Sequence, residues 1–317
     1  PKKCSIYIGP IKALTSDIVV VKDTRSGDEP ATWAGRISTA IKNAGVDSIT
    51  MDDVDVENGS LENKRVAIYP YNPSVSDKEM DALDAFVKSG GKLIVCYLVQ
   101  QKMADMLGIK VIGHERQKYD GEFSQMKTLS SNASKKFLGM PKIYNQSSWN
   151  ITKVAPNANN AYVLSNWFDN KGNDTGFPSM VISDTGLFVS HVLINDDTTN
   201  LNKLLRAVLG SFDNSLWPDI TKNAFVNAET VLPRWNSFND AAKWIKSEAK
   251  RLKKQSVEKE LNNTLKYRKD AVSLAKAKKY PKSLDNLEKQ TSSLIKAYAL
   301  VQPAKKGEFR AVWCHSA

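Results

Sequence analysis

The stretch RVAIYPYNPSVSDKEMDALDAFVKSGGKLIVCYLVQQKMADMLGI, residues 65–109 of 317, decides the fold. It opens with the apolar run Val66–Tyr69, which prolines close, and a second apolar run covers Lys92–Tyr97. Short apolar runs bounded by turn residues are typical of strands buried on both faces. The stretch therefore predicts two neighbouring core strands.

The segment between these runs predicts an amphipathic helix. Ser76 is followed three residues later by Glu79, which is the spacing of a capping box. Gly90-Gly91 ends the pattern, because glycine suits the left-handed conformation at a helix C-terminus. The apolar face consists of Met80, Leu83, Phe86 and Val87. A second helix follows the second strand and stops at Gly108. Strand, helix, strand, helix with short connections predicts a parallel sheet with right-handed crossovers.

The residues before this stretch continue the same alternation. Asp17–Val21 and Asp47–Met51 are expected to be strands, with a helix around Trp33–Ile41 between them. The acidic run Asp52–Glu57 has the carboxylates that a hard cation prefers, but it lacks the spacing of a calcium loop. A solvated loop is the favoured interpretation. Cys4–Ile8 is a short alternating run, expected to be an edge strand or a lead-in.

After Gly121 the pattern changes to alternating residues rich in glycine and asparagine. It predicts antiparallel additions to the sheet, or a small flap over it, at Phe123–Leu129, Ala161–Trp167, Ser179–Ser183 and Leu187–Leu193. A helix at Asn200–Phe212 follows, and Trp217-Pro218 is expected to close the unit. The fold class is therefore α/β, with a mainly parallel sheet and antiparallel additions, followed by an α-helical hairpin.

Three regions follow from this pattern. Residues 1–218 are expected to form the α/β domain, residues 219–303 a basic helical hairpin or three-helix unit, and residues 304–317 a linker and one further strand. Helical periodicity in the second region breaks near Gln255 and again at Tyr280-Pro281, where proline suits the first helical position. In the last region the apolar segment Phe309–Trp313 is predicted to be a strand that has no partner in this chain.

The net charge of +11 is concentrated in one segment. Between Trp235 and Lys306 there are 18 Lys/Arg and 7 Asp/Glu residues, a difference that equals the whole net charge. Such a surface would suit nucleic acid, anionic lipid or an acidic polymer. Lysine-rich solvated helices are the favoured alternative, because the segment lacks the exposed aromatic residues that single-strand binders interleave with basic ones. Nucleic acid is therefore not expected as a partner.

Composition excludes several classes of protein and site. With 41% hydrophobic and 25% charged residues, the chain is neither disordered nor fibrous in character. No apolar run approaches the length of a membrane span, and no signal-peptide pattern occurs. Cys4, Cys96 and Cys314 give neither a disulfide framework nor the spacing of zinc ligands. No metal or cofactor is expected.

Residues 63–109 resemble class I glutamine-amidotransferase-like (flavodoxin-like) domains. The resemblance rests on the segments YPYNP, DALDAFVKSGGKLIV and MADMLGI, and it extends over residues 1–215. It implies a Cys nucleophile on a sharp strand-to-helix elbow, served by a His from a later segment. Cys96 and His191 are the candidates, and as a pair they would make a Cys-dependent hydrolase.

Three features of the sequence favour a degenerate site instead. Cys96 is followed by Tyr97-Leu98-Val99, without the glycine that the elbow of the family uses. No acidic residue follows His191 at the His-x-Glu spacing of the family. Cys96 also lies within an apolar run, where cysteine is usually a small core residue. His114, expected in a loop, has no obvious partner.

The final segment GEFRAVWCHSA, residues 307–317, resembles the first barrel strand of glycosyl-hydrolase-like family 10 proteins. The two resemblances together imply a carbohydrate-active protein that is secreted, periplasmic or on the cell surface. Its (β/α)8 barrel would be the C-terminal partner of this chain, with its catalytic carboxylates beyond Ala317.

Aromatic residues beside amide side chains suggest a sugar-binding surface. Trp149, Trp167 and Phe168 occur among Asn, Asp and Gly residues, and the favoured alternative is that they are core residues of a small sheet. The resulting hypothesis is a non-catalytic N-terminal portion of a glycoside hydrolase, structural or carbohydrate-binding. The alternatives are a hydrolase using Cys96 and His191, and a protein that binds an anionic polymer through its basic helices.

Overall fold

The computed structural model describes residues 16–131 and 134–302 of the chain. They form two compact units that divide between Leu216 and Trp217, here called the α/β unit and the helical unit. The segments Cys4–Ile8, Pro303–Gly307 and Phe309–Trp313, for which an edge strand, a linker and a barrel strand were predicted, lie outside the described residues.

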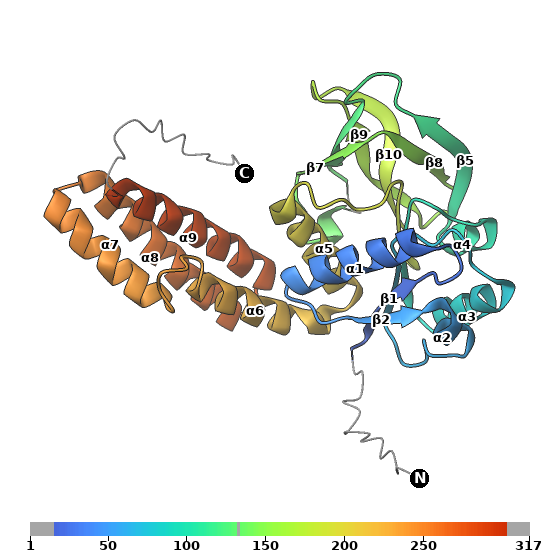
Figure 1. The fold of residues 1–317 in the computed structure, drawn as a ribbon, viewed down its shortest axis with the longest axis horizontal. Coiled ribbons are helices and arrows are strands. Elements are labelled where there is room, and N and C mark those ends of the chain that lie inside the picture. Colours follow the sequence, from blue (N-terminus) through green and yellow to red (C-terminus); the bar gives the residue numbers. More distant parts are fainter. Residues whose placement is uncertain (1–15, 132–133, 303–317) are drawn as a thin grey trace, which may run out of the picture. The chain divides into compact units, whose positions relative to one another are not determined.

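A run of five parallel strands forms the centre of the α/β unit (Figure 1). Their order in the sheet is β2-β1-β3-β4-β11, which is the flavodoxin-like order when only the parallel strands are counted. The prediction of a mainly parallel α/β sheet is confirmed. The strands are β1 (Ile18–Lys22), β2 (Ile49–Asp52), β3 (Val66–Tyr69), β4 (Lys92–Cys96) and β11 (Gly186–Val189).

Antiparallel strands extend this sheet to nine strands, in the order β10, β9, β6, β7 beyond β11. A separate antiparallel pair, β5 with β8, lies at the top of Figure 1. The sequence placed Leu187–Leu193 among the antiparallel additions, but β11 is antiparallel only to β10 and is parallel to β4. His114, expected in a loop, lies in β5. The bounds are β5 (Ile109–Arg116), β6 (Phe123–Thr128), β7 (Ile143–Ser148), β8 (Asn150–Pro156), β9 (Tyr162–Phe168) and β10 (Asp174–Ile182).

Helices cover the parallel sheet in two groups. Helix α1 packs beside α5, whereas α3 packs beside both α2 and α4. Their bounds are α1 (Asp28–Asn43), α2 (Asp53–Glu57), α3 (Asp77–Lys88), α4 (Gln101–Met106) and α5 (Thr198–Phe212), with short 3-10 turns at Ser134–Lys136 and Asn214–Leu216.

The acidic run Asp52–Glu57 is not the solvated loop that the sequence suggested. It forms α2, because the Asp55 carboxylate accepts a hydrogen bond from the backbone N–H of Asp52 at 3.2 Å and so caps the helix. Asp53 is fully buried at the start of this helix. The run therefore contributes a buried carboxylate to the interior of the α/β unit.

Close packing of β11 against β4 requires glycine at one position. A Cβ added to Gly186 would lie 1.9 Å from the carbonyl oxygen of Leu93, its neighbour across the sheet. No side chain fits at that distance, so Gly186 allows the last parallel strand to dock.

The helical unit contains α6 (Trp217–Glu229), α7 (Phe238–Leu252), α8 (Gln255–Lys276) and α9 (Tyr280–Val301) in the part of the chain that is described. Trp217-Pro218 was expected to close the preceding unit but begins α6, since proline is tolerated in the first turn of a helix. The predicted breaks near Gln255 and at Pro281 coincide with the starts of α8 and α9. Across the described ranges, no helix is both long and apolar enough to cross a membrane.

Candidate functional site

The chain leaves β4 through a strained turn centred on Tyr97. This residue has a φ of 65°, and the N–H of Leu98 donates to the carbonyl of Cys96 at 2.9 Å. The bond closes a three-residue γ-turn of the rare positive-φ form. A bulky residue in this region is an outlier that costs about 1–3 kcal/mol. We call this strained turn after β4 the elbow; it forms although no glycine follows Cys96.

Three contacts hold Tyr97 in this conformation. Its backbone N–H donates to the carbonyl of Val189 at 2.8 Å, and its own carbonyl accepts from Oγ1 of Thr152 at 2.6 Å. Its phenolic oxygen accepts from Nδ2 of Asn150 at 2.5 Å. Strand β11 and strand β8 thus fix both ends of the residue.

Aromatic and imidazole rings gather around Tyr97 at the carboxyl ends of the parallel strands. The ring of Tyr71, which follows β3, lies 6.1 Å away between centroids at an interplanar angle of 16°. The rings of His191 and His114 lie 5.2 and 6.0 Å away. We call Tyr71, Tyr97, His114 and His191 the edge cluster. In open α/β sheets, ligands bind outside the carboxyl ends of the strands.

The two histidines of the edge cluster have different surroundings. His191 is buried, and burial lowers the pKa of its imidazole, although its contact with the carbonyl of Val192 opposes this. Its Nδ1 lies 3.3 Å from Nε2 of Gln146. His114 is exposed, and its Nδ1 lies 3.2 Å from Oγ1 of Thr152. His191 is therefore a neutral group beside Tyr97 at neutral pH.

The candidate nucleophile Cys96 does not have the properties of an activated thiol. Cys96 is fully buried in β4, and burial raises the pKa of its thiol to about 12. The thiolate, which is the reactive form, is thus disfavoured at neutral pH. The ring that contacts His191 belongs to Tyr97, the residue after Cys96.

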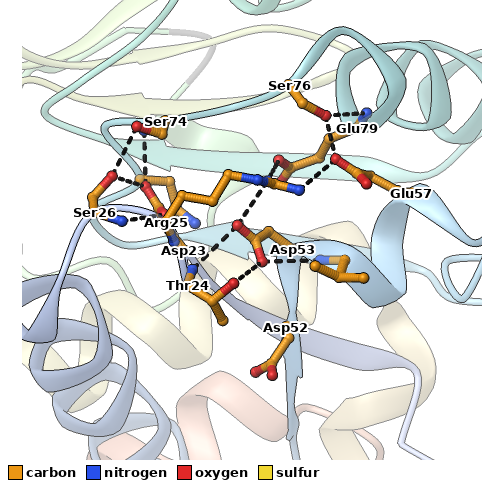
Figure 2. Close-up of polar contacts among 12 residues, drawn as sticks. Asp23, Thr24, Arg25, Ser26, Asp52, Asp53, Glu57, Ser74, Ser76 and Glu79 are labelled. Carbon is orange, nitrogen blue, oxygen red and sulfur yellow. Dashed lines mark hydrogen bonds and ion pairs between the residues drawn. The ribbon is translucent and has the colours of Figure 1, made fainter.

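A second polar cluster lies where the strand order reverses, between β1 and β3 (Figure 2). The carboxylate of Asp23 accepts hydrogen bonds from the backbone N–H groups of Arg25, Ser26 and Ser74 at 2.7, 3.0 and 2.8 Å. It also accepts from the hydroxyl of Ser26 at 2.6 Å. Asp23 therefore joins the loop after β1 to the loop after β3.

Arg25 supplies the positive charge of this second cluster. Its guanidinium contacts Asp53 at 2.7 Å, Glu57 at 2.5 Å and Glu79 at 3.4 Å (Figure 2). Oε1 of Glu79 accepts from the hydroxyl of Tyr69 at 2.9 Å. One cation thus links three carboxylates from α2 and α3. Within the described ranges, no group of three or more acidic, His or Cys side chains is arranged to hold a metal ion.

Burial raises the pKa of Glu79 to about 7, and the neighbouring Asp53 carboxylate adds to the increase. The hydrogen bond from Tyr69 and the charge of Arg25 act in the opposite direction. The sequence predicted a capping box here. The hydroxyl of Ser76 does accept from the N–H of Glu79 at 3.2 Å, but the Glu79 side chain turns to Tyr69.

The three aromatic residues proposed from sequence lie in different environments. Trp167 is fully buried and its Nε1 donates to Oγ of Ser190 at 2.7 Å, so its ring is a core group and cannot stack on a ligand. Trp149 is 57% exposed, with the guanidinium of Arg116 5.6 Å from its ring centre. Phe168 is half-buried, and Nζ of Lys127 lies 4.2 Å above its ring.

Sequence reasoning missed Tyr71 and Tyr97 as site residues. Each follows a strand that was correctly predicted, and adjacent parallel strands end at the same edge of a sheet. The order of the strands would therefore have brought these two tyrosines together.

No protein-family model matches the chain, and no curated protein matches it by sequence. Solved structures similar to it include a β-galactosidase from Bacillus circulans sp. alkalophilus, at 13% identity and a TM-score of 0.46. That match covers 63% of this chain and 31% of the β-galactosidase, so the chain spans about a third of that enzyme.

Two further matches are to shorter proteins. A ThuA-like protein from Bacteroides uniformis has 13% identity and a TM-score of 0.48, with 66% of this chain and 95% of that protein covered. A glutamine amidotransferase from Thermotoga maritima has 12% identity and a TM-score of 0.38, with coverages of 62% and 96%. The solved structures to which the chain is similar thus include amidotransferase and ThuA-like proteins, and its fold class follows from its own strand order.

Proposed function

We infer that this chain is the non-catalytic N-terminal portion of a carbohydrate-active protein, and that its α/β unit binds carbohydrate. The observation that carries the proposal is the residue at the elbow after β4. A Cys-dependent amidotransferase would carry its nucleophile on such an elbow, whereas this chain places Tyr97 there and buries Cys96 beside it.

The carbohydrate part of the proposal is supported by the chemistry of the edge cluster. Tyrosine rings combine an apolar face with a polar tip, and sugar rings present C–H faces flanked by hydroxyl groups. The resemblance of residues 307–317 to a first barrel strand supplies the second argument. It makes a C-terminal (β/α)8 barrel the partner of this chain, in a protein that is exported.

Thiol reactivity tests the non-catalytic part directly. Cys4 and Cys314 are replaced by serine, and the native chain is treated with a thiol reagent across a range of pH. We expect Cys96 to react only at the rate of unfolding, because its thiol is buried and its pKa is about 12. A matched chain that also carries C96S gives the background.

The opposite outcome would favour the Cys-dependent hydrolase. It consists of a fast-reacting thiol in the native chain, together with amide or ester hydrolysis that both Cys96→Ala and His191→Ala abolish. Hydrolysis that survives both substitutions would be assigned to a contaminant.

A second candidate function rests on a lysine stripe along α7. Lys243, Lys246, Lys250 and Lys253 are all exposed and follow the spacing i, i+3, i+7, i+10. This spacing places Lys243, Lys246 and Lys250 on one face of the helix, opposite the buried face that contains Ile245. Lys253 follows them as the left-handed residue that ends the helix. Such a stripe would suit an anionic polymer, and its binding would weaken steeply with salt.

Binding of double-stranded DNA and of heparin at low salt tests this candidate. Replacing the four lysines of the stripe by glutamine is expected to weaken binding by at least about tenfold. The control replaces the exposed Lys42, Lys78, Lys110 and Lys171, which changes the net charge equally on the α/β unit. Equal losses in the two variants, or no binding by the wild type, would exclude the stripe as a site.

A further inference from the structure

Two asparagines, one next to Tyr71 in the chain and one bonded to Tyr97, each have an unpaired oxygen. Asn72 follows Tyr71 and is 5% exposed; its Nδ2 donates to the carbonyl of Val21 at 3.3 Å. Asn150 donates through Nδ2 to the phenolic oxygen of Tyr97 at 2.5 Å. The Oδ1 atoms of both are buried and have no hydrogen-bond partner. Buried polar atoms without a partner are rare in folded proteins and require an explanation.

The contact with Val21 fixes which atom the Asn72 amide offers. Turning the Asn72 amide over would bring its oxygen against the carbonyl of Val21, where two acceptors would face each other. Since Nδ2 of Asn72 donates to a carbonyl, the atom it leaves over is an acceptor. A phenol both donates and accepts, so the Tyr97 contact fits either orientation of the Asn150 amide; in the observed one Nδ2 donates and Oδ1 is left as a second acceptor. A molecule that satisfies both must bring donors, such as the hydroxyl groups of a sugar.

The charge around the tyrosine pair favours a neutral ligand over an anionic one. Burial raises the pKa of the Tyr71 hydroxyl, and the negative charges of Glu29 and Asp23 contribute to this increase. His191, whose ring lies beside Tyr97, is a neutral group. An acidic sugar would therefore meet like charge beside Tyr71.

We propose that Tyr71, Tyr97, Asn72 and Asn150 form a binding site for a neutral saccharide. One C–H face of the sugar lies against the tyrosine pair, whose rings are nearly parallel and partly exposed. Its hydroxyl groups donate to Oδ1 of the two asparagines after small movements of the side chains that cover these atoms. This assignment rests on the proposed function, since it locates the carbohydrate that the α/β unit binds.

The contacts of Tyr97 explain why a strained residue suits this site. The γ-turn brings Tyr97 beside Tyr71 and within reach of Asn150. Because Thr152 and Val189 hold its backbone, the ring is in position before a ligand arrives. Pre-organisation of this kind lowers the entropy that binding must overcome.

The test is calorimetric titration of the full chain with neutral oligosaccharides. The probes are cellohexaose, laminarihexaose, xylohexaose, maltohexaose and a β-1,4-galactohexaose, with a pectic hexagalacturonate as the anionic comparison. Tyr71→Ala and Asn150→Ala are expected to weaken binding of the preferred neutral probe by at least about tenfold, which is about 1.4 kcal/mol. Tyr162→Ala removes a 49% exposed tyrosine elsewhere in this unit and is expected to have no effect.

A measurement on the wild-type chain avoids dependence on folded variants. The side-chain amide resonances of Asn72 and Asn150 are followed by NMR during the same titration. Shifts of both that saturate with the calorimetric dissociation constant support the site. Unmoved resonances in a chain that binds sugar overturn it.

The results of the titrations distinguish a wrong binding site from the absence of carbohydrate binding. Binding that survives Tyr71→Ala but is lost in Trp149→Ala leaves carbohydrate binding in place and moves the site to Trp149. A preference for the hexagalacturonate overturns the neutral-ligand assignment. A wild-type chain that binds none of the probes overturns the proposed function itself.

Discussion

The hydroxyl of Tyr69 donates a hydrogen bond to the Glu79 carboxylate at 2.9 Å, and neither side chain is accessible to water. The bond joins the end of β3 to the first turn of α3. Because burial raises the pKa of Glu79 to about 7, the two residues form an interaction that depends on pH in the physiological range.

The free energy of unfolding should fall as the pH rises from about 4.5 to about 7. In this window folded Glu79 keeps a proton that the unfolded chain has lost, so the contribution is complete below pH 4.5 and lost above pH 7. At about 1.4 kcal/mol per pKa unit, the decrease is up to about 3 kcal/mol. Glu79→Gln should flatten this part of the profile measured by chemical denaturation. The exposed Glu62→Gln is the control, and an unchanged slope in Glu79→Gln would show that another group titrates.

Removing Arg25 should move this titration to higher pH. Arg25 lowers the pKa of Glu79 and contacts the buried Asp53, so Arg25→Met leaves both carboxylates less compensated. We expect the free energy of unfolding to fall by about 3 kcal/mol at pH 8 and by less at pH 5, where Glu79 is neutral. Denaturation at both pH values, with NMR of the Glu79 carboxyl carbon, measures the effect. The control is the exposed Lys42→Met, which should lose little stability, and the same amount at pH 5 as at pH 8. A loss in Arg25→Met that is the same at the two pH values would contradict the expected role of Arg25.

At position 97 glycine should give a more stable protein than alanine. Both substitutions lose the ring and its contacts, but alanine keeps the unfavourable φ of 65° and glycine does not. Tyr97→Gly should therefore be more stable than Tyr97→Ala by about 1 kcal/mol. At the exposed helical position Lys246 the order should reverse, with glycine less stable by about 0.5–1 kcal/mol. The same order at both positions would mean that the γ-turn is absent in solution.

Gly186 and Gly35 should respond oppositely to alanine. At Gly186 the new Cβ would meet the Leu93 carbonyl at 1.9 Å, so β11 has to move away from β4 at a cost of about 3 kcal/mol or more. Gly35 lies inside α1 with no atom within 4 Å of a new Cβ, and Gly35→Ala should stabilise by about 0.5–1 kcal/mol. Thermal unfolding of the two variants gives the signs directly. A Gly186→Ala chain as stable as wild type would show that the sheet adapts at this point.

The parts of the fold that were predictable are those with a strong local pattern. Strand β3 is a short apolar run, β4 is apolar after Lys92, and α3 has a clear cap and apolar stripe. Strand β7 has the sequence IYNQSS, and its membership of the sheet depends on β6, its partner. Nothing within such a polar segment distinguishes it from a loop. The parallel pairing of β11 with β4 joins strands that are far apart in the sequence, and neither hydrophobic periodicity nor composition shows which strands will pair.

The candidate site shows the same limit at the level of single residues. The absence of glycine after Cys96 argued against an elbow, yet hydrogen bonds from Thr152 and to Val189 hold Tyr97 in one. Glu79 has the spacing of a capping residue, but the hydroxyl of Tyr69 binds its side chain instead. In both cases a tertiary contact overrides the local preference, and the adjacent residues in the sequence do not reveal such a contact.

The pairing of β4 with β11 has a consequence for how the chain is made. Strand β4 leaves the ribosome early, but the strand that covers its second edge follows only after β5 to β10 have been synthesised. During that interval a nascent chain presents an apolar strand with unpaired backbone groups, which is a template for association with other chains. We expect chaperones to bind there, and the docking of Gly186–Val189 to be a late step of folding, because distant pairings form slowly.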